Sequence, residues 1–193
     1  MKFIKKNRFL RNFTCNNLSK PWAEKKYQQI KSYLNPGQKI IDIGAGKCVL
    51  TQLLQQKGYS VIALDVQNLS LVEEIEPLIY NGEQIPFPDK SFDKALLLTV
   101  LHHTHNPQQI LREASRVARE VIIIEDIYTN TLNRYLTYFM DSLMNFEFSG
   151  HPHNNKTDLQ WQKLFKKLNL KIKDKKKHKV FHYFQQITYH LLT

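Results

Sequence analysis

The stretch of sequence that decides the fold reads Lys39-Ile-Ile-Asp-Ile-Gly-Ala-Gly-Lys-Cys48. Residues 39–43 predict a short buried strand, and the apolar residues after Cys48 recur at helical spacing up to Lys57. Glycine is needed between the two elements, because the chain turns tightly there and lets a ligand approach its backbone. The first N–H groups of a following helix point toward a polar ligand. The stretch therefore predicts a strand, a ligand-binding glycine loop and a helix.

A carboxylate at the end of the next strand narrows the kind of ligand. Asp65 ends the predicted strand 60–64 and lies 23 residues after Asp42. A carboxylate in that place can accept hydrogen bonds from both hydroxyls of a ribose. The loop lacks the third glycine that allows close approach of a pyrophosphate. The pattern favours a nucleoside over a dinucleotide such as NAD.

Apolar runs and helical patterns alternate along the chain, which is typical of parallel βαβ units. Together they predict an α/β fold: a doubly wound, Rossmann-like, seven-stranded and mostly parallel sheet with an antiparallel C-terminal edge pair. Further strands are expected at 78–80, 95–100 and 121–124, with the edge pair at 170–173 and 180–187. Helices are expected at 21–34, at 48–57, after Asn106-Pro107 and after Thr157-Asp158.

Composition and charge set outer bounds on the function. The chain has 193 residues, 42% of them hydrophobic and 23% charged, which suits one globular domain. Two cysteines without CxxC spacing and no long apolar run predict a reducing, cytoplasmic location and no transmembrane segment. The net charge of +11 is concentrated at the two ends of the chain, residues 1–41 and 156–193. These basic ends are explained by solubility or by an anionic partner.

Four segments together resemble the class I methyltransferases that use S-adenosylmethionine (SAM), within the group of methyltransferase type 11-like domains. The segments are Ile40–Gly46, Val61–Asp65, Asn81–Asp93 and Leu96–Thr104. The third is the most specific, because an acidic or amide residue shortly before its Pro-Phe pair meets the adenine in that family. The resemblance implies SAM as cofactor. It also implies these cofactor-binding residues: Asp42, Gly44, Ala45, Gly46, Asp65, Val66, Asn81, Gly82, Glu83 and Thr99.

The resemblance also organises the chain as one domain over residues 1–193. It divides into an N-terminal helical segment (1–35), a cofactor-binding core (36–126) and a lid or acceptor region with the closing strands (127–193). Within the last part, the aromatic stretch Tyr135–Phe148 and Gly150–His153 are expected to form a lid over the acceptor, because they interrupt the regular βα alternation.

Catalysis by methyl transfer needs alignment of nucleophile and methyl group, and a general base only when the acceptor must lose a proton. We expect His103 and Asp126 to be the catalytic pair, since the ends of strands four and five both face the site in this fold class. Other candidate bases are His102, His105, Glu125, His151 and His153. The same groups could assemble a divalent metal site, but their spacing matches no compact ligand motif, and no metal is expected.

The sequence does not identify the methyl acceptor. A small molecule is the preferred substrate. The basic ends and aromatic residues such as Trp22, Tyr27 and Trp161 favour a nucleic-acid methyltransferase instead, although no Asn/Asp-Pro-Pro-Tyr-type motif follows the fourth strand. A third alternative is a SAM-binding regulatory module without catalysis. The oligomeric state is not predicted.

Overall fold

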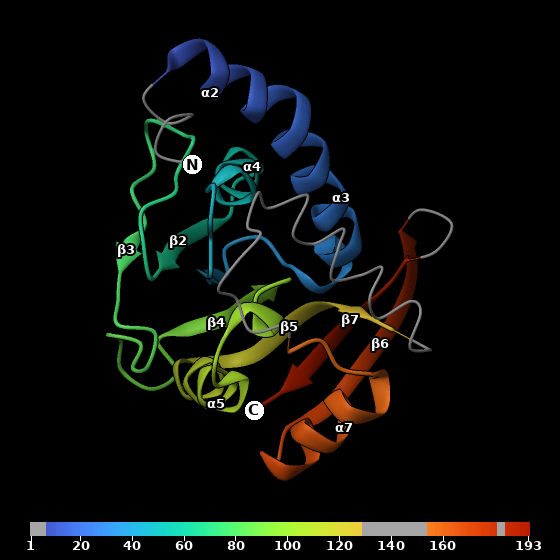
Figure 1. Cartoon of the computed structure of the whole chain (residues 1–193). Helices are drawn as coiled ribbons and strands as arrows, with labels where there is room; N and C mark the ends of the chain where they lie inside the picture. The colour runs from blue at the N-terminus through green and yellow to red at the C-terminus, as the bar shows by residue number, and fades with distance from the viewer. Residues whose placement is uncertain (1–6, 129–153, 181–183) are drawn as a thin grey trace.

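The computed structural model of the chain describes residues 7–128, 154–180 and 184–193. A seven-stranded sheet runs through it in the order β3-β2-β1-β4-β5-β7-β6 (Figure 1). The strands are β1 Lys39–Ile43, β2 Ser60–Asp65, β3 Leu78–Ile79, β4 Phe92–Leu98, β5 Ala118–Ile127, β6 Lys171–Val180 and β7 Phe184–Leu192. Strands β1 to β5 run parallel to one another, and β7 is antiparallel to both β5 and β6. The predicted fold class is confirmed.

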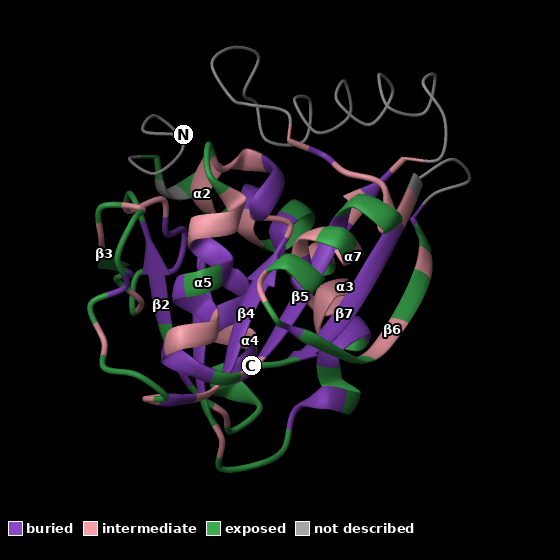
Figure 2. Cartoon of the chain, turned by 90° about the horizontal axis from the view of Figure 1, so that it is seen from below, coloured by how far each residue is buried: buried purple, intermediate pink, exposed green. Residues whose placement is uncertain are grey.

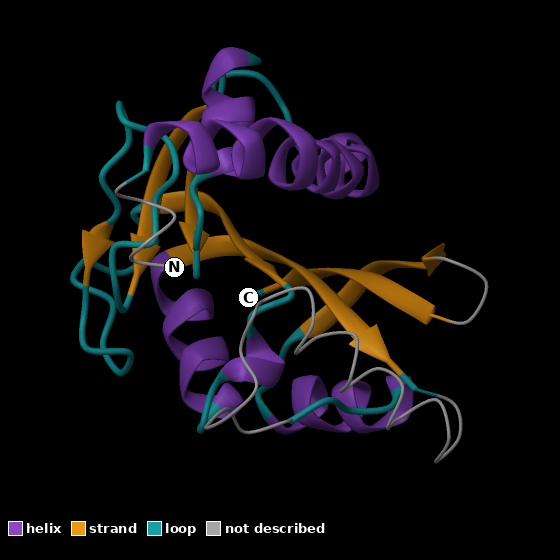
Figure 3. Ribbon diagram, turned by 45° about the horizontal axis from the view of Figure 1, so that its top comes forward, coloured by secondary structure: helices purple, strands orange, loops and turns teal. Residues whose placement is uncertain are grey.

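Helices cover both faces of the sheet (Figure 3). On one face lie α3 Lys20–Ile30 and α4 Val49–Gln56, which pack Ile30 and Leu54 onto the even-numbered residues of β4 and β5. On the other face lie α5 Pro107–Val117 and α7 Asp158–Lys167, which pack Leu111 and Trp161 onto the odd-numbered ones. The alternation of a strand's side chains thus sends its neighbouring residues into two separate cores.

The helix predicted at residues 21–34 is part of a longer helical run that begins earlier, within the predicted N-terminal helical segment. Helix α2 (Arg8–Thr14) continues through a π-helical turn, η1 (Cys15–Ser19), directly into α3, and a 3₁₀ turn, η2 (Lys31–Tyr33), ends the run. In the π turn the N–H of Lys20 donates to the carbonyl of Cys15. Pro21 lies in the first turn of α3, where a residue without an N–H is tolerated. It therefore marks the start of α3 but not the start of the helical run.

The two C-terminal strands form the predicted antiparallel pair at the edge of the sheet, but both are longer than expected. Strand β7 lies between β5 and β6, so β6 is the outermost strand. Ile187, Tyr189 and Leu191 of β7 are fully buried, whereas most of β6 is exposed or half-buried (Figure 2). Among the described residues, no helix has the length and apolar character needed to span a membrane.

Candidate functional site

The glycine loop joins the carboxyl end of β1 to the start of α4. Gly44 and Gly46 both adopt positive φ, +74° and +52°, a conformation that glycine adopts without strain. The N–H groups of Gly44 and Ala45 donate to the carbonyl of Leu64 at 2.8 and 3.1 Å, which fastens the loop to β2. A Cβ on Gly44 would lie 2.7 Å from Val100, whereas one on Gly46 would meet only the Gly44 carbonyl at 4.0 Å. The open space above Gly46 fits close approach of a ligand to the backbone.

Asp65 ends β2 beside this loop, as the sequence predicts. One carboxylate oxygen accepts the Gly46 N–H at 2.7 Å, and the other accepts the Val66 N–H at 2.7 Å and the Gln67 N–H at 3.3 Å. Only 8% of Asp65 is exposed. Because a carboxylate offers about four lone-pair positions, most of its accepting capacity already holds the backbone. Asp65 therefore holds the loop in shape, and its predicted contact with a ribose would share this carboxylate.

Asp42, the residue before the loop, is buried and accepts a hydrogen bond from the Thr51 hydroxyl of α4 at 2.7 Å. Burial raises the pKa of this carboxyl to about 6, against the opposing effects of the Thr51 bond and of the positive charge on Lys26. The side chain ties β1 to α4 across the glycine loop. Its replacement is expected to affect both loop geometry and fold stability.

The segment after β3 lies beside the loop, because the N–H of Tyr80 donates to the carbonyl of Asp65 at 3.1 Å. Asn81 is exposed, and its side-chain oxygen accepts the N–H groups of Glu83 and Gln84 at 2.9 and 3.0 Å. This turn brings Gly82 next to Val66, since a Cβ on Gly82 would lie 3.2 Å from Val66 Cγ1. The predicted adenine-side residues are thus gathered at one end of the site.

Two of the candidate bases from the sequence bind each other. The Nδ1 of His102 lies 2.6 Å from Glu125 Oε2, and both side chains are almost fully buried. The other oxygen of Glu125 accepts the N–H groups of Val100 and Leu101 at 3.1 and 2.8 Å. Glu125 therefore fixes η3, the 3₁₀ turn Leu101–His103 that follows β4. The alternation of side chains along β5 could have predicted that Glu125 is buried, because Glu125 shares a strand face with the core residues Ile123 and Ile127.

Of the predicted catalytic pair, His103 follows β4 in η3, whereas Asp126 lies within β5, because this strand extends three residues beyond the predicted 121–124. His103 is half-buried, and its ring centroid lies 4.1 Å from that of His102. Asp126 is half-buried on the strand face opposite to Glu125, and its charge opposes the lowering of the Lys26 pKa that burial causes. These contacts lead to different partners, so the pairing of His103 with Asp126 stays a prediction. The predicted lid, Tyr135–Phe148 with Gly150–His153, lies outside the described residues.

Lys26 of α3 is a site residue that the sequence prediction missed. Its amine donates to the carbonyl of Leu98 at 2.9 Å and to the hydroxyl of Thr99 at 2.7 Å, at the carboxyl end of β4. Thr99, a predicted cofactor residue, has a strained φ of +62°. The helical spacing predicts that Lys26 lies on the buried face of α3, since it comes three residues after the buried Ala23 and four before the buried Ile30.

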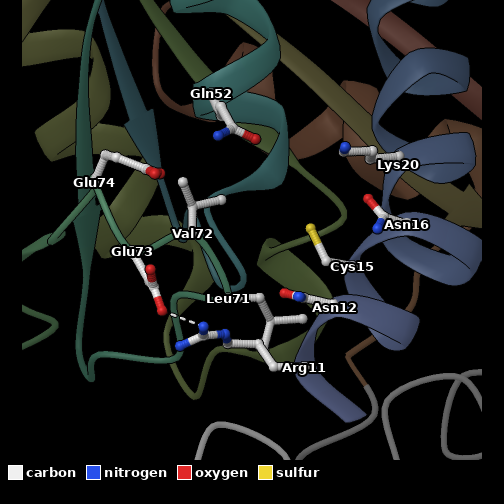
Figure 4. Close-up of a pocket in the computed structure, with 10 residues that line it drawn as sticks. All are labelled: Arg11, Asn12, Cys15, Asn16, Lys20, Gln52, Leu71, Val72, Glu73 and Glu74. Atoms are coloured by element: carbon white, nitrogen blue, oxygen red, sulfur yellow. Dashed lines mark hydrogen bonds and ion pairs between the residues drawn. The ribbon is translucent and has the colours of Figure 1, made fainter. Parts of the chain in front are cut away.

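A separate cavity of about 200 Å³ lies between the N-terminal helical run and the segment after β2 (Figure 4). Arg11 and Glu73 form an ion pair across it, and Cys15, Lys20 and Gln52 contribute to its lining. None of the predicted cofactor residues lines it. Within the described ranges, no group of three His, Cys, Asp or Glu side chains is placed to hold a metal ion.

Comparison with known proteins places this geometry in context. A family described as "Methyltransferase domain" matches residues 41–121. Demethylmenaquinone methyltransferase of Corynebacterium glutamicum is 29% identical over 102 residues, covering 51% of this chain and 44% of the relative. The enzyme of the same name from Tropheryma whipplei is 32% identical over 92 residues, covering 43% and 38%. The chain thus matches less than half the length of these relatives.

Solved structures share the fold at low sequence identity. A SAM-dependent methyltransferase of Methanosarcina mazei superimposes with a TM-score of 0.71 at 18% identity, covering 85% of this chain and 96% of that one. Magnesium protoporphyrin IX methyltransferase of Synechocystis, solved with bound S-adenosylhomocysteine (SAH), gives 0.64 at 16% identity, covering 91% and 84%. At these identities the likeness concerns the fold.

Proposed function

The chain belongs to the class I SAM-dependent methyltransferase family, and we propose that it transfers a methyl group from SAM to a small-molecule acceptor. SAM supplies a methyl group activated by its sulfonium, so that the acceptor atom attacks in line and the sulfur leaves with the electron pair. The chain's own contribution is to bind the two reactants next to each other, with the acceptor atom aligned to the methyl group.

The observation that carries the proposal is the glycine loop fastened to Asp65. Gly46 leaves open space above its backbone, while Asp65 and the loop are held together by the 2.7 Å bond from the Gly46 N–H. In the proposed complex, Asp65 accepts a bond from the ribose, and Gly44 to Gly46 lie against the amino-acid end of the cofactor. Val66, Asn81, Gly82 and Glu83 would border the adenine, with Thr99 beside the reacting groups.

For the acceptor side, we propose that His103 and Asp126 face the bound substrate. Histidine has an ordinary pKa suited to accept a proton near neutral pH, and a carboxylate can orient a hydroxyl or hold a proton nearby. The relatives named demethylmenaquinone methyltransferase support a small-molecule acceptor. Each of these roles can be tested by replacing the residue and measuring turnover apart from cofactor binding.

A nucleic-acid acceptor is the second candidate, favoured by the lysines of β6. Part of that positive charge is balanced within the protein, since Lys173 pairs with Glu120 at 3.0 Å and Lys175 with Asp158 at 2.9 Å. Charge that is paired in this way contributes less to a field that attracts a polyanion. The balance of observations supports the small-molecule acceptor.

The test combines binding with product formation. Calorimetry on the full chain is expected to show binding of SAM and SAH and none of NAD. Methyl-labelled SAM is then incubated with the protein and separate small-metabolite, lipid and RNA fractions, with label expected in the small-metabolite or lipid fraction. Heat with NAD but not with SAM would overturn the cofactor assignment. Label confined to RNA, or SAM binding without product in any fraction, would overturn the proposed acceptor or catalysis, respectively.

A further inference from the structure

Lys26 brings a positively charged group from the N-terminal helical run to the carboxyl edge of the sheet. Its amine donates to Leu98 O and Thr99 Oγ1, residues more than seventy positions away in the chain. Within the described part of the chain these are its two hydrogen bonds, and an ammonium has three N–H donors. The amine is thus anchored on β4 with one donor left to point elsewhere.

The surroundings of this amine are strongly charged. Burial lowers the pKa of Lys26, while the carboxylates of Asp42, Asp126 and Glu125 oppose that effect, and the nearby Lys47 adds to it. Asp42 precedes the glycine loop and Lys47 lies within it. Lys26 therefore stands between the glycine loop and the end of β4, where both border the proposed cofactor site.

A desolvated amine of this kind gains from an anionic ligand. An opposite charge nearby favours the ammonium form and recovers part of the cost of burial. SAM and SAH both carry a carboxylate on their amino-acid end, which is the part that the glycine loop meets in the proposed complex. Charge-assisted hydrogen bonds to carboxylates are among the stronger polar contacts in proteins.

We propose that Lys26 binds the carboxylate on the amino-acid end of the cofactor. This inference rests on the proposed function, since it concerns the same site. It makes the N-terminal helical run part of the cofactor site and gives α3 a role in choosing ligands that carry an amino-acid end. Lys26 is a binding residue in this scheme, and it takes no part in methyl transfer itself.

The experiment uses one ligand with the amino-acid end and one without it. SAH carries the amino-acid end, whereas 5′-methylthioadenosine keeps the nucleoside and the sulfur and lacks the whole amino-acid end, the carboxylate and the amino group. Binding of each ligand to the unaltered 193-residue chain and to Lys26→Met is measured by calorimetry. We expect Lys26→Met to weaken SAH binding by about 10- to 100-fold, the effect of losing one charge-assisted bond. Binding of 5′-methylthioadenosine should change by less than about 2-fold.

Matched variants separate this role from others. Lys25→Met removes a lysine of the same helix whose amine lies 5.2 Å from the Trp22 ring centroid, and it should leave both affinities unchanged. Lys26→Gln keeps an N–H donor for Leu98 and Thr99 but removes the charge. It should reproduce the selective loss even where Lys26→Met folds poorly.

The outcomes are distinct. Equal losses for both ligands would show that Lys26 supports the fold of the site, and an unchanged SAH affinity would show that the carboxylate binds elsewhere; either result overturns the inference. A selective loss in Lys47→Met instead of Lys26→Met would move the carboxylate to the glycine loop and overturn it too. If the unaltered chain binds neither ligand, the proposed function itself fails.

Discussion

Asp65 joins the end of β2 to the glycine loop through its carboxylate. The sequence pattern alone predicts that Asp65→Ala weakens SAM binding and leaves stability nearly unchanged. The structure changes that expectation, because the carboxylate accepts the N–H groups of Gly46, Val66 and Gln67. Removing a partner of buried donors costs free energy even without ligand. Stability and affinity are therefore linked at this residue.

We expect Asp65→Ala to lower the free energy of unfolding by about 1 to 3 kcal/mol and to weaken SAH binding at least about tenfold. Urea unfolding without ligand and calorimetry with SAH measure the two effects. Asp93→Ala serves as control. Asp93 also accepts a backbone N–H, that of Lys39 at 2.8 Å, but it lies at the amino end of β4, whereas the proposed site lies at the carboxyl end. That variant should lose some stability and keep its SAH affinity. Unchanged stability in Asp65→Ala would argue against the backbone role.

Asp42 gives a pH-dependent prediction. Its pKa in the folded chain is about 6, above the ordinary 3.8, so the folded state binds more protons than the unfolded state between pH 4 and 6. Its contribution to stability is therefore lost as the pH rises through that window. The free energy of unfolding, relative to Asp42→Asn, should fall by roughly 2 kcal/mol from pH 4 to pH 7, since one pKa unit corresponds to about 1.4 kcal/mol.

Urea unfolding of both proteins over a series of pH values measures this difference. The asparagine keeps an oxygen that can accept the Thr51 hydroxyl, so the comparison isolates ionisation of the carboxyl from loss of the hydrogen bond. A difference that stays constant from pH 4 to pH 7 would contradict the raised pKa.

At the scale of elements, the glycine loop depends on the turn after β4. Gly44 combines a φ of +74° with close contact to Val100, while Gly58 has a φ of +85° and open space around it, since a Cβ there would meet nothing within 4 Å. An alanine at Gly58 meets only the conformational cost of positive φ. An alanine at Gly44 has the same conformational cost and also clashes with Val100. Comparing the two substitutions therefore separates the conformational cost from the cost of the clash.

Gly44→Ala is expected to destabilise the chain by about 1 to 3 kcal/mol more than Gly58→Ala, as overpacking does. The double variant Gly44→Ala with Val100→Ala should be more stable than the two single effects predict, because it removes the two contacts at 2.7 Å with the Val100 methyl groups. Thermal and urea unfolding of the set provide the values. Additive effects of the two substitutions would show that the loop and the turn are not in contact as described.

At the scale of the whole molecule, the position of β7 makes the C-terminal strand part of the interior. Ile187 of β7 is fully buried between β5 and β6, whereas Ile172 of the edge strand β6 is 39% exposed. The two isoleucines lie in neighbouring strands and differ mainly in burial. Their replacement by alanine therefore reports the strand order.

We expect Ile187→Ala to lower the free energy of unfolding by about 2 to 5 kcal/mol, the usual range for a buried isoleucine. Ile172→Ala should cost less than about 1 kcal/mol, because partly exposed side chains contribute less to the core. Equilibrium unfolding in urea distinguishes the two. Equal costs would be incompatible with β7 inside the sheet and β6 at its edge.

The sequence by itself determined the α/β class, strand β1 at residues 39–43, the glycine loop, the acid at the end of β2 and the capped start of α7. These features depend on residues close together in the chain, where the periods of helix and strand and the needs of turns and caps act directly. The family resemblance was carried by the same local segments.

Only the tertiary structure decided the inner place of β7, the pairing of His102 with Glu125, the backbone bonds of Asp65 and the position of Lys26. Each depends on groups brought together across the chain, as when Lys26 reaches Leu98 and Gln29 reaches Gln186. Such contacts follow from how the sheet orders its strands and which face each helix covers. Local sequence patterns do not determine the strand order or the face that each helix covers. These depend on the burial of apolar side chains and the pairing of charges summed over the whole molecule.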